Sequence, residues 1–157
     1  MKIEEKYDST YDTRKHINRV GLYLAIVQGF LSKRADLHDA SKLLPPEKEC
    51  FDEITPLLKN TTYGSQEYKD TLNRMRPAIE HHQKNNRHHP EYFENGIAGM
   101  NLIDLVEMIC DWKAASERHA DGDIYKSLEI NMKRFGIEPQ LLSILKNTVD
   151  WLVKEKE

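Results

Sequence analysis

Apolar residues recur at intervals of three and four along most of this chain, and they rarely alternate with polar residues. This spacing matches the 3.6 residues of an α-helical turn and argues against strands, whose side chains change face at every residue. Only 7 glycines and 6 prolines interrupt the pattern in 157 residues. The sequence therefore predicts an all-α fold of about six to seven helices.

Capping residues and turn residues divide the chain into individual helices. Asp12 or Thr13 can cap the first helix and Asn101 the fifth, while Gly136 can end the sixth. Two helices carry an internal proline, at positions 56 and 77, where a disturbance or bend is expected. The predicted helices cover about 12–32, 34–43, 47–59, 65–82, 102–119, 123–135 and 139 onward. The apolar stripes expected to face the core are Ile17, Val20, Leu24, Val27 and Leu31, then Leu102, Leu105, Val106, Ile109 and Trp112, then Leu142, Leu145, Val149 and Leu152.

The length of the chain fits one domain, so we predict a single domain over 1–157. No apolar run approaches the ~20 residues that span a bilayer, and the charged N-terminus has no apolar stretch of a signal peptide behind it. Cys50 and Cys110 form neither a CxxC pair nor a dense disulfide pattern. We therefore expect a cytoplasmic protein without a membrane partner.

The formal net charge is -3, and basic residues are interspersed with acidic ones. Binding of long nucleic acid needs a concentrated positive field, so this class of partner is not expected. A small phosphorylated ligand remains compatible with the charge if a metal supplies positive charge locally. The oligomeric state stays open, a homo-oligomer included.

The chain contains seven histidines, and any one of them alone is more often a surface or core residue than a ligand. The adjacent pair His38 and Asp39 has more weight, because imidazole nitrogen and carboxylate oxygen bind borderline divalent metals. Lys42 follows one helical turn later and could steer a phosphate oxygen. A solvated polar face on a short helix is the alternative.

One face of the fifth predicted helix carries charged residues. Asp104, Glu107, Asp111 and Arg118 share this face, because they lie at offsets of 0, 3, 7 and 14. Arg118 could bind a phosphate, and the small Ala115 leaves room for a substrate. Asp104 and Glu107 are expected to be solvated or to hydrogen-bond to metal ligands.

The order of these residues, His16, then His38-Asp39, then His81-His82, then Asp111, resembles the signature of the HD superfamily of metal-dependent phosphohydrolases. The resemblance implies a single HD-type helical domain with a metal held by His16, His38, Asp39 and Asp111. Lys42 after the HD pair, and the double histidine, are similar to the HD-GYP branch, in which the aspartate bridges to a second metal. His81 or His82 would bind that second metal, and His81 is the ligand that we expect.

Two other features qualify the resemblance. The double histidine is followed by Gln83 and then by His88-His89-Pro90, where HD-GYP proteins have an acid and Gly-Tyr-Pro, so specificity for cyclic-di-GMP is not implied. The chain as a whole most resembles a small uncharacterised HD-like family of bacteria and phages, which implies no substrate. The stretches that carry this likeness are 86–91, 99–108, 111–116 and 117–124.

Taken together, these features predict hydrolysis of a nucleotide or another small phosphate ester by metal-activated water. One or two divalent ions are expected, chosen from Mn, Fe, Co, Ni and Zn. Lys42 and Arg118 would stabilise the phosphoryl oxygens. Arg87, His88 and His89 are expected to contact substrate, although the two histidines could also bind a second metal or belong to a hydrogen-bonded loop. The alternatives are a non-catalytic module that binds a nucleotide or signal molecule, and a structural metal site.

Overall fold

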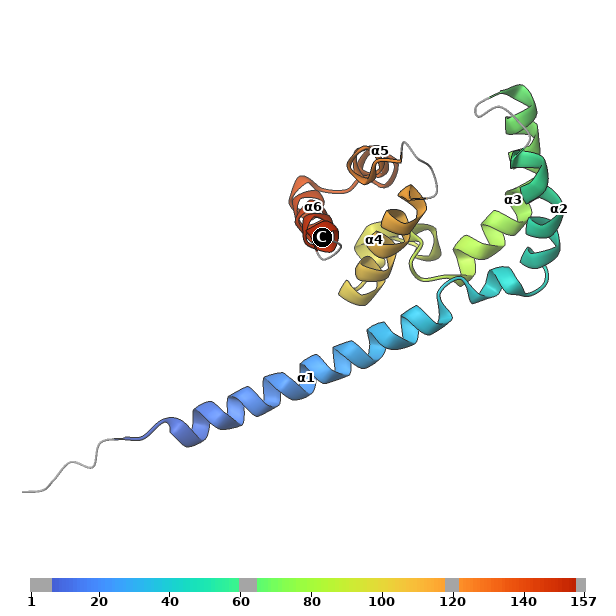
Figure 1. Ribbon diagram of the computed structural model, residues 1–157. Coiled ribbons are helices and arrows are strands. Elements are labelled where there is room, and N and C mark those ends of the chain that lie inside the picture. Colours follow the sequence, from blue (N-terminus) through green and yellow to red (C-terminus); the bar gives the residue numbers. More distant parts are fainter. Residues whose placement is uncertain (1–6, 60–64, 118–121, 155–157) are drawn as a thin grey trace, which may run out of the picture. The chain divides into compact units, whose positions relative to one another are not determined.

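The computed structural model describes residues 7–59, 65–117 and 122–154, which form helices, 3-10 turns and connecting segments without a strand (Figure 1). This confirms the all-α prediction. None of the described helices has the length and apolarity needed to cross a membrane. The elements of the described residues are α1 (Thr10–Leu37), η1 (Ala40–Leu43), α2 (Glu47–Lys59), α3 (Gln66–Asn85), η2 (Pro90–Tyr92), η3 (Gly96–Gly99), α4 (Leu102–Ser116), α5 (Ile124–Phe135) and α6 (Pro139–Lys154).

The chain divides into two compact units, Met1–Asp36 and Leu37–Glu157. The described part of the first unit consists of α1 and the few residues before it. All other helices, and every described histidine except His16, belong to the second unit. The single domain expected over 1–157 stays a prediction.

The first helix is longer than predicted. α1 continues to Leu37 instead of ending near position 32, because residues 32–37 contain neither glycine nor proline. The helix stops where Asp39 adopts a left-handed backbone conformation, with φ of 56°. The separate helix predicted over 34–43 is therefore wrong: its residues form the last turn of α1, a break and the 3-10 turn η1.

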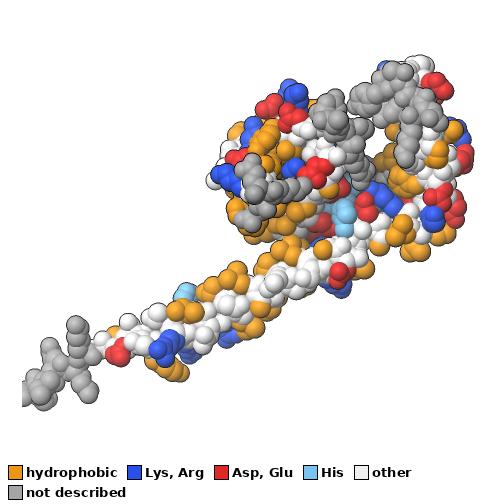
Figure 2. Space-filling model, viewed as in Figure 1, with side chains coloured by type: hydrophobic (Ala, Val, Ile, Leu, Met, Phe, Trp, Pro, Cys, Tyr) orange, Lys and Arg blue, Asp and Glu red, His pale blue; other side chains and the backbone are white. Residues whose placement is uncertain are grey.

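The predicted apolar stripe of α1 is not buried within its own unit. No residue of α1 is buried, and apolar side chains are visible along the helix in Figure 2. A lone helix has no second element in its unit against which an apolar face could pack.

In the second unit, α2 and α3 pair with each other, and α4, α5 and α6 form a three-helix group (Figure 1). Ile54 of α2 and Met75 and Ala78 of α3 are buried, and a larger cluster of buried apolar residues lies within the three-helix group. Its members are Met108, Ile109, Ile124, Leu128, Ile137, Leu145 and Val149.

The core face of α4 is rotated from the one predicted. Ile109 is buried as expected, but Leu102 and Val106 are 77% and 38% exposed. The buried side of the helix is centred on Asp104 and Met108, which lie one turn apart on the same face, so a polar side chain shares this face with an apolar one. Leu102 and Val106 lie on the remaining side of the helix, which faces solvent in the described unit.

Capping of α4 and α5 agrees with the sequence, whereas α1 begins at Thr10, ahead of the caps predicted at Asp12 or Thr13. The Asn101 side chain accepts hydrogen bonds from the backbone N–H groups of Ile103 and Asp104, and the Asp104 carboxylate accepts one from the Asn101 N–H. This reciprocal capping box starts α4 where predicted. Gly136 ends α5 with φ of 62°, a conformation that favours glycine.

Candidate metal centre

Histidine and carboxylate side chains from four parts of the second unit meet in one cluster. The contributing parts are the break between α1 and η1, the start of α2, the C-terminal half of α3 with the segment that follows it, and α4. Figure 2 shows histidine at the surface of this unit, next to acidic and basic side chains. The pairing of α2 with α3 and the capped start of α4 thus position the cluster.

The first group of potential ligands, called the first subsite, consists of His38, Asp39 and Asp111. One ligand atom of each residue lies within 4.8 Å of the others. His38 Nε2 is 3.7 Å from Asp39 Oδ2 and 3.6 Å from Asp111 Oδ1. The three side chains are 29%, 20% and 19% exposed, so solvent reaches this subsite.

The second group, called the second subsite, consists of His82, His88 and His89. The side chains of His82 and His88 are only 5% and 2% exposed. Among the described residues, four buried side-chain atoms have no hydrogen-bond partner: the Nε2 atoms of these three histidines and Asp39 Oδ1. A buried polar atom that makes no hydrogen bond lowers the free energy of unfolding by about 1–3 kcal/mol.

Asp39 connects the two subsites through its two carboxylate oxygens. Oδ1 lies 3.1 Å from His82 Nε2 and 3.5 Å from His88 Nε2, whereas Oδ2 is the oxygen near His38. Asp39 adopts a left-handed backbone conformation, which lies about 1–2 kcal/mol higher in free energy than the right-handed one for an L-residue. Such a conformation outside glycine is uncommon and is often found at functional sites.

Two further carboxylates hold the opposite ring nitrogens of the histidines. Glu47, which is fully buried, accepts hydrogen bonds at Oε1 from His81 Nδ1 (2.7 Å) and at Oε2 from His82 Nδ1 (2.9 Å). Glu107 Oε1 lies 3.0 Å from His38 Nδ1 and 3.2 Å from His88 Nδ1. The Nε2 atoms of His38, His82 and His88 are thereby left facing Asp39.

The charges of the cluster are strongly coupled. The Asp111 carboxylate, followed by that of Glu107, raises the pKa of His38 to about 10. Burial, reinforced by His88 and His82, lowers the pKa of His89 to about 3. The second subsite therefore contains at least one imidazole that stays neutral at physiological pH, as a metal ligand must.

The acidic groups of the first subsite ionise readily although they are partly buried. Burial opposes ionisation of Asp39, but His82 and Lys42 outweigh it and hold its pKa well below the usual range. Burial likewise opposes ionisation of Asp111, and the interaction with His38 brings its pKa below the ordinary value. Both groups are carboxylates at neutral pH and could bind a cation.

Lys42 lies beside the first subsite. Its ammonium group is 2.6 Å from Asp39 Oδ2, and its side chain is 30% exposed. A lysine at this point can reach a phosphate oxygen without being a metal ligand.

Arg87 pairs with a carboxylate of α4, and its expected contact with substrate stays a prediction. Its Nε and Nη2 atoms donate to Asp104 Oδ1 (3.0 Å) and Oδ2 (2.8 Å), and its guanidinium lies 4.8 Å from the centre of the Phe93 ring. Asp104 is fully buried, so it is not the solvated residue that we expected as one alternative. This bidentate pair fixes the segment that carries His88 and His89 against α4.

Most of the predicted site residues of the second unit come together, but some do not. His81 contacts Glu47 and is outside the three groups whose ligand atoms converge among the described residues. His16 lies on α1 in the first unit, so its role as a ligand stays a prediction. Arg118 lies outside the described residues. Glu47 was missed, and its only sequence signal is a position in the first turn of a helix after two prolines.

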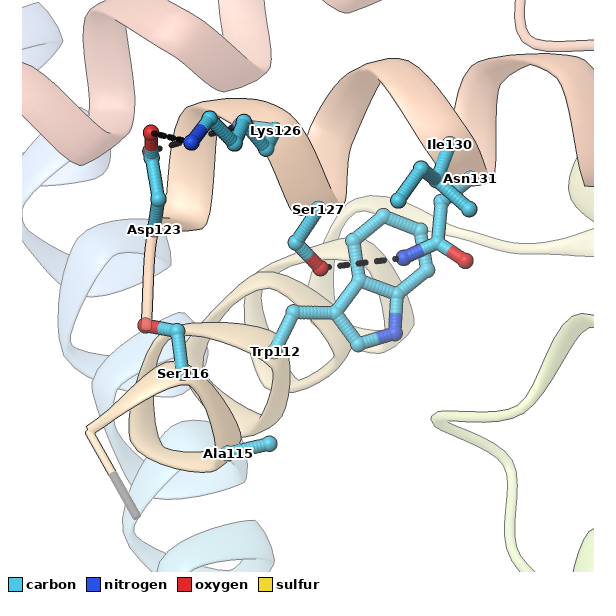
Figure 3. A pocket seen from close by; sticks show the side chains of 8 residues that line it. All are labelled: Trp112, Ala115, Ser116, Asp123, Lys126, Ser127, Ile130 and Asn131. Carbon is cyan, nitrogen blue, oxygen red and sulfur yellow. Dashed lines mark hydrogen bonds and ion pairs between the residues drawn. The ribbon is translucent and has the colours of Figure 1, made fainter. Parts of the chain in front are cut away.

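A pocket of about 370 Å³ lies between α4 and α5. Figure 3 shows Ala115 and Ser116 of α4 at one side of it, with the Trp112 indole between them and the Ser127 and Asn131 side chains of α5. Ala115 follows Asp111 by one helical turn, and it lines the pocket. The expectation that a small residue leaves space here agrees with this geometry.

The model of DUF5662, a family of unknown function, matches residues 5–151, so the chain belongs to this family. No curated protein and no solved structure matches the chain.

Proposed function

We propose that this member of the DUF5662 family is a cytoplasmic metal-dependent phosphohydrolase that acts on a nucleotide or another small phosphate ester. The observation that carries the proposal is the set of four buried atoms without a hydrogen bond that converge on one another, Asp39 Oδ1 and Nε2 of His82, His88 and His89. A folded chain rarely keeps several such atoms together without a ligand. A divalent cation would satisfy all four.

The donor set indicates which cations fit. Imidazole nitrogens whose other nitrogen donates to a carboxylate are the usual arrangement behind a bound metal, and Glu47 and Glu107 provide it here. Three imidazoles with a carboxylate favour Zn, Ni, Co, Fe or Mn over Mg or Ca. The same side chains could hold two ions, one at each subsite, with Asp39 as a ligand to both.

The first subsite supports catalysis better than a purely structural role. When bound there, the metal lowers the pKa of a water molecule toward neutrality and offsets charge at the phosphorus. His38, Asp39 and Asp111 are partly exposed, so a substrate can approach. Lys42 would hold a phosphoryl oxygen, and Arg118 is proposed to do the same.

The pocket between α4 and α5 is proposed to take the non-phosphate part of the substrate. Trp112 offers an aromatic surface, while Asn131 and Ser127 offer hydrogen-bonding groups. These are the side-chain types that a nucleobase or another planar polar group needs.

Purified protein loaded with Mn²⁺, Fe²⁺, Co²⁺, Ni²⁺ or Zn²⁺ should release phosphate from, or cleave, members of a panel of phosphomonoesters, phosphodiesters and nucleotides. The double variant His38→Ala, Asp39→Ala should lose this activity, and Lys42→Gln should lose turnover but keep metal. Asp52→Asn is the matched control, because Asp52 pairs with Lys48 on an exposed part of α2.

The other outcomes of this experiment identify the rival functions. Ligand binding without product would show a binding module in place of an enzyme. Unfolding on metal removal, with no small molecule competing at the first subsite, would show a structural metal site. Activity that survives the double variant would come from a contaminant and would overturn the proposal.

A further inference from the structure

Glu107 contacts one histidine of each subsite with a single oxygen atom. Its Oε1 lies 3.0 Å from Nδ1 of His38 in the first subsite and 3.2 Å from Nδ1 of His88 in the second. The Glu107 side chain is only 9% exposed. This buried carboxylate therefore faces two imidazoles whose other nitrogens point to Asp39.

A neutral imidazole carries one N–H, and its position decides which nitrogen can bind a metal. Donation from Nδ1 to a carboxylate places the hydrogen there and leaves the lone pair on Nε2. His88 Nε2 is buried and has no hydrogen-bond partner among the described residues, so it gains most from binding a cation. The Glu107 carboxylate, 3.2 Å from His88 Nδ1, thus favours the His88 tautomer with its hydrogen on Nδ1.

We propose that Glu107 is a positioning residue that prepares one ligand of each metal subsite, so that its loss weakens both subsites together. This inference rests on the proposed metal centre. Glu47 has the corresponding role for the second subsite alone, because its partners are His82 and the exposed His81.

Glu107 could alternatively be a ligand itself, since Glu107, His38 and His88 also have ligand atoms within 4.8 Å of one another. A metal on that side would occupy Nδ1 of both histidines. The proton of His88 would then have to sit on Nε2, which lies 3.5 Å from Asp39 Oδ1 and makes no hydrogen bond. The cost of an unsatisfied buried donor favours the positioning role.

The test combines zinc titration with NMR of the imidazole nitrogens. Two-bond ¹H–¹⁵N spectra of the zinc-loaded wild type should show Nε2 of His38 and His88 bound to metal and Nδ1 protonated. Glu107→Ala should still bind two ions, with both affinities reduced ~10–100-fold, as is typical for residues behind metal ligands. Glu107→Gln, which keeps an acceptor oxygen, should restore most of this loss. Glu47→Ala should weaken only one binding step.

Three results would overturn the inference. Zinc bound at Nδ1, or loss of one full equivalent in both Glu107→Ala and Glu107→Gln, would make Glu107 a ligand. Unchanged zinc affinities in Glu107→Ala, with a wild-type circular dichroism spectrum, would remove its positioning role. If the wild-type protein binds neither zinc nor any other metal of the panel, the proposed metal centre is overturned, and this inference with it.

Discussion

The two subsites share Asp39 but differ in ligand type and burial. The first offers one imidazole and two carboxylates and is open to solvent, whereas the second offers three imidazoles and is almost closed. The second has buried imidazole nitrogens of the kind that hold an ion tightly, and the first has the access that a substrate needs. One cluster of side chains could thus separate metal retention from chemistry.

The largest effect is expected from Asp39→Asn, because this residue serves both subsites. Asparagine tolerates the left-handed backbone, so the fold should persist. We expect both metals to be lost and activity to fall by more than the ~10–100-fold typical of residues behind ligands. Metal analysis after dialysis measures this, with Asp52→Asn as the exposed control. Two ions retained by Asp39→Asn would contradict a shared ligand.

The next largest effects should separate the subsites. His89→Ala should remove the tightly held ion, since it deletes one of the three imidazoles of the second subsite. Asp111→Asn should remove only the exchangeable ion and leave one equivalent that resists a brief chelator wash. His81→Ala, whose ring lies outside the converging groups, is the control and should keep both ions. Equal losses in His89→Ala and Asp111→Asn would show that the subsites are not distinct.

The sequence predicted more of the fold than of the detailed site. The helical period, the cap at Asn101 and the stop at Gly136 identify the helices, since these signals are local. We predicted a break near position 32, but the sequence has no glycine or proline there to end the helix, and α1 continues to Leu37.

The choice between His81 and His82 could not be made from sequence. Neighbouring residues of a helix point about 100° apart, and the rotation of α3 depends on its packing against α2. Glu47 was missed for a related reason: its contacts with His81 and His82 join residues more than thirty positions apart. Tertiary packing alone brings them together.

A smaller effect is expected in the pH dependence of metal binding. Because Asp111 and Glu107 raise the pKa of His38 to about 10, a metal at this nitrogen must displace a proton. Affinity at the first subsite should rise about tenfold per pH unit from 6.5 toward 10. His89, with a pKa of about 3, adds no such dependence in this range. Mn²⁺ titrations of His89→Ala at several pH values measure the slope, and a flat profile would contradict it.

The raised pKa of His38 also makes the stability of the metal-free fold depend on pH. His38 binds its proton more tightly in the folded chain, so it stabilises the fold below pH 6.5, and this contribution is lost as the pH rises toward 10. Thermal unfolding of the metal-free protein across this range provides an independent check.

The smallest effect is expected from the pocket between α4 and α5. Ala115→Leu should fill part of the space between α4 and α5 and raise KM several-fold, with metal content unchanged. Ala114→Leu is the matched control, because Ala114 is exposed on the same helix and does not line the pocket. Steady-state kinetics on any substrate found in the panel would decide this. Equal KM values in Ala115→Leu and the wild type would place the substrate elsewhere.

The most direct test of the metal centre is an anomalous-scattering map from crystals grown with Mn²⁺ or Zn²⁺. We expect one peak about 2.0–2.3 Å from ligand atoms of His82, His88 and His89, and a second peak against His38, Asp39 and Asp111. Asp39 should contact both peaks. A map with no peak at the cluster, at a metal concentration that saturates binding in solution, would contradict the proposed metal centre.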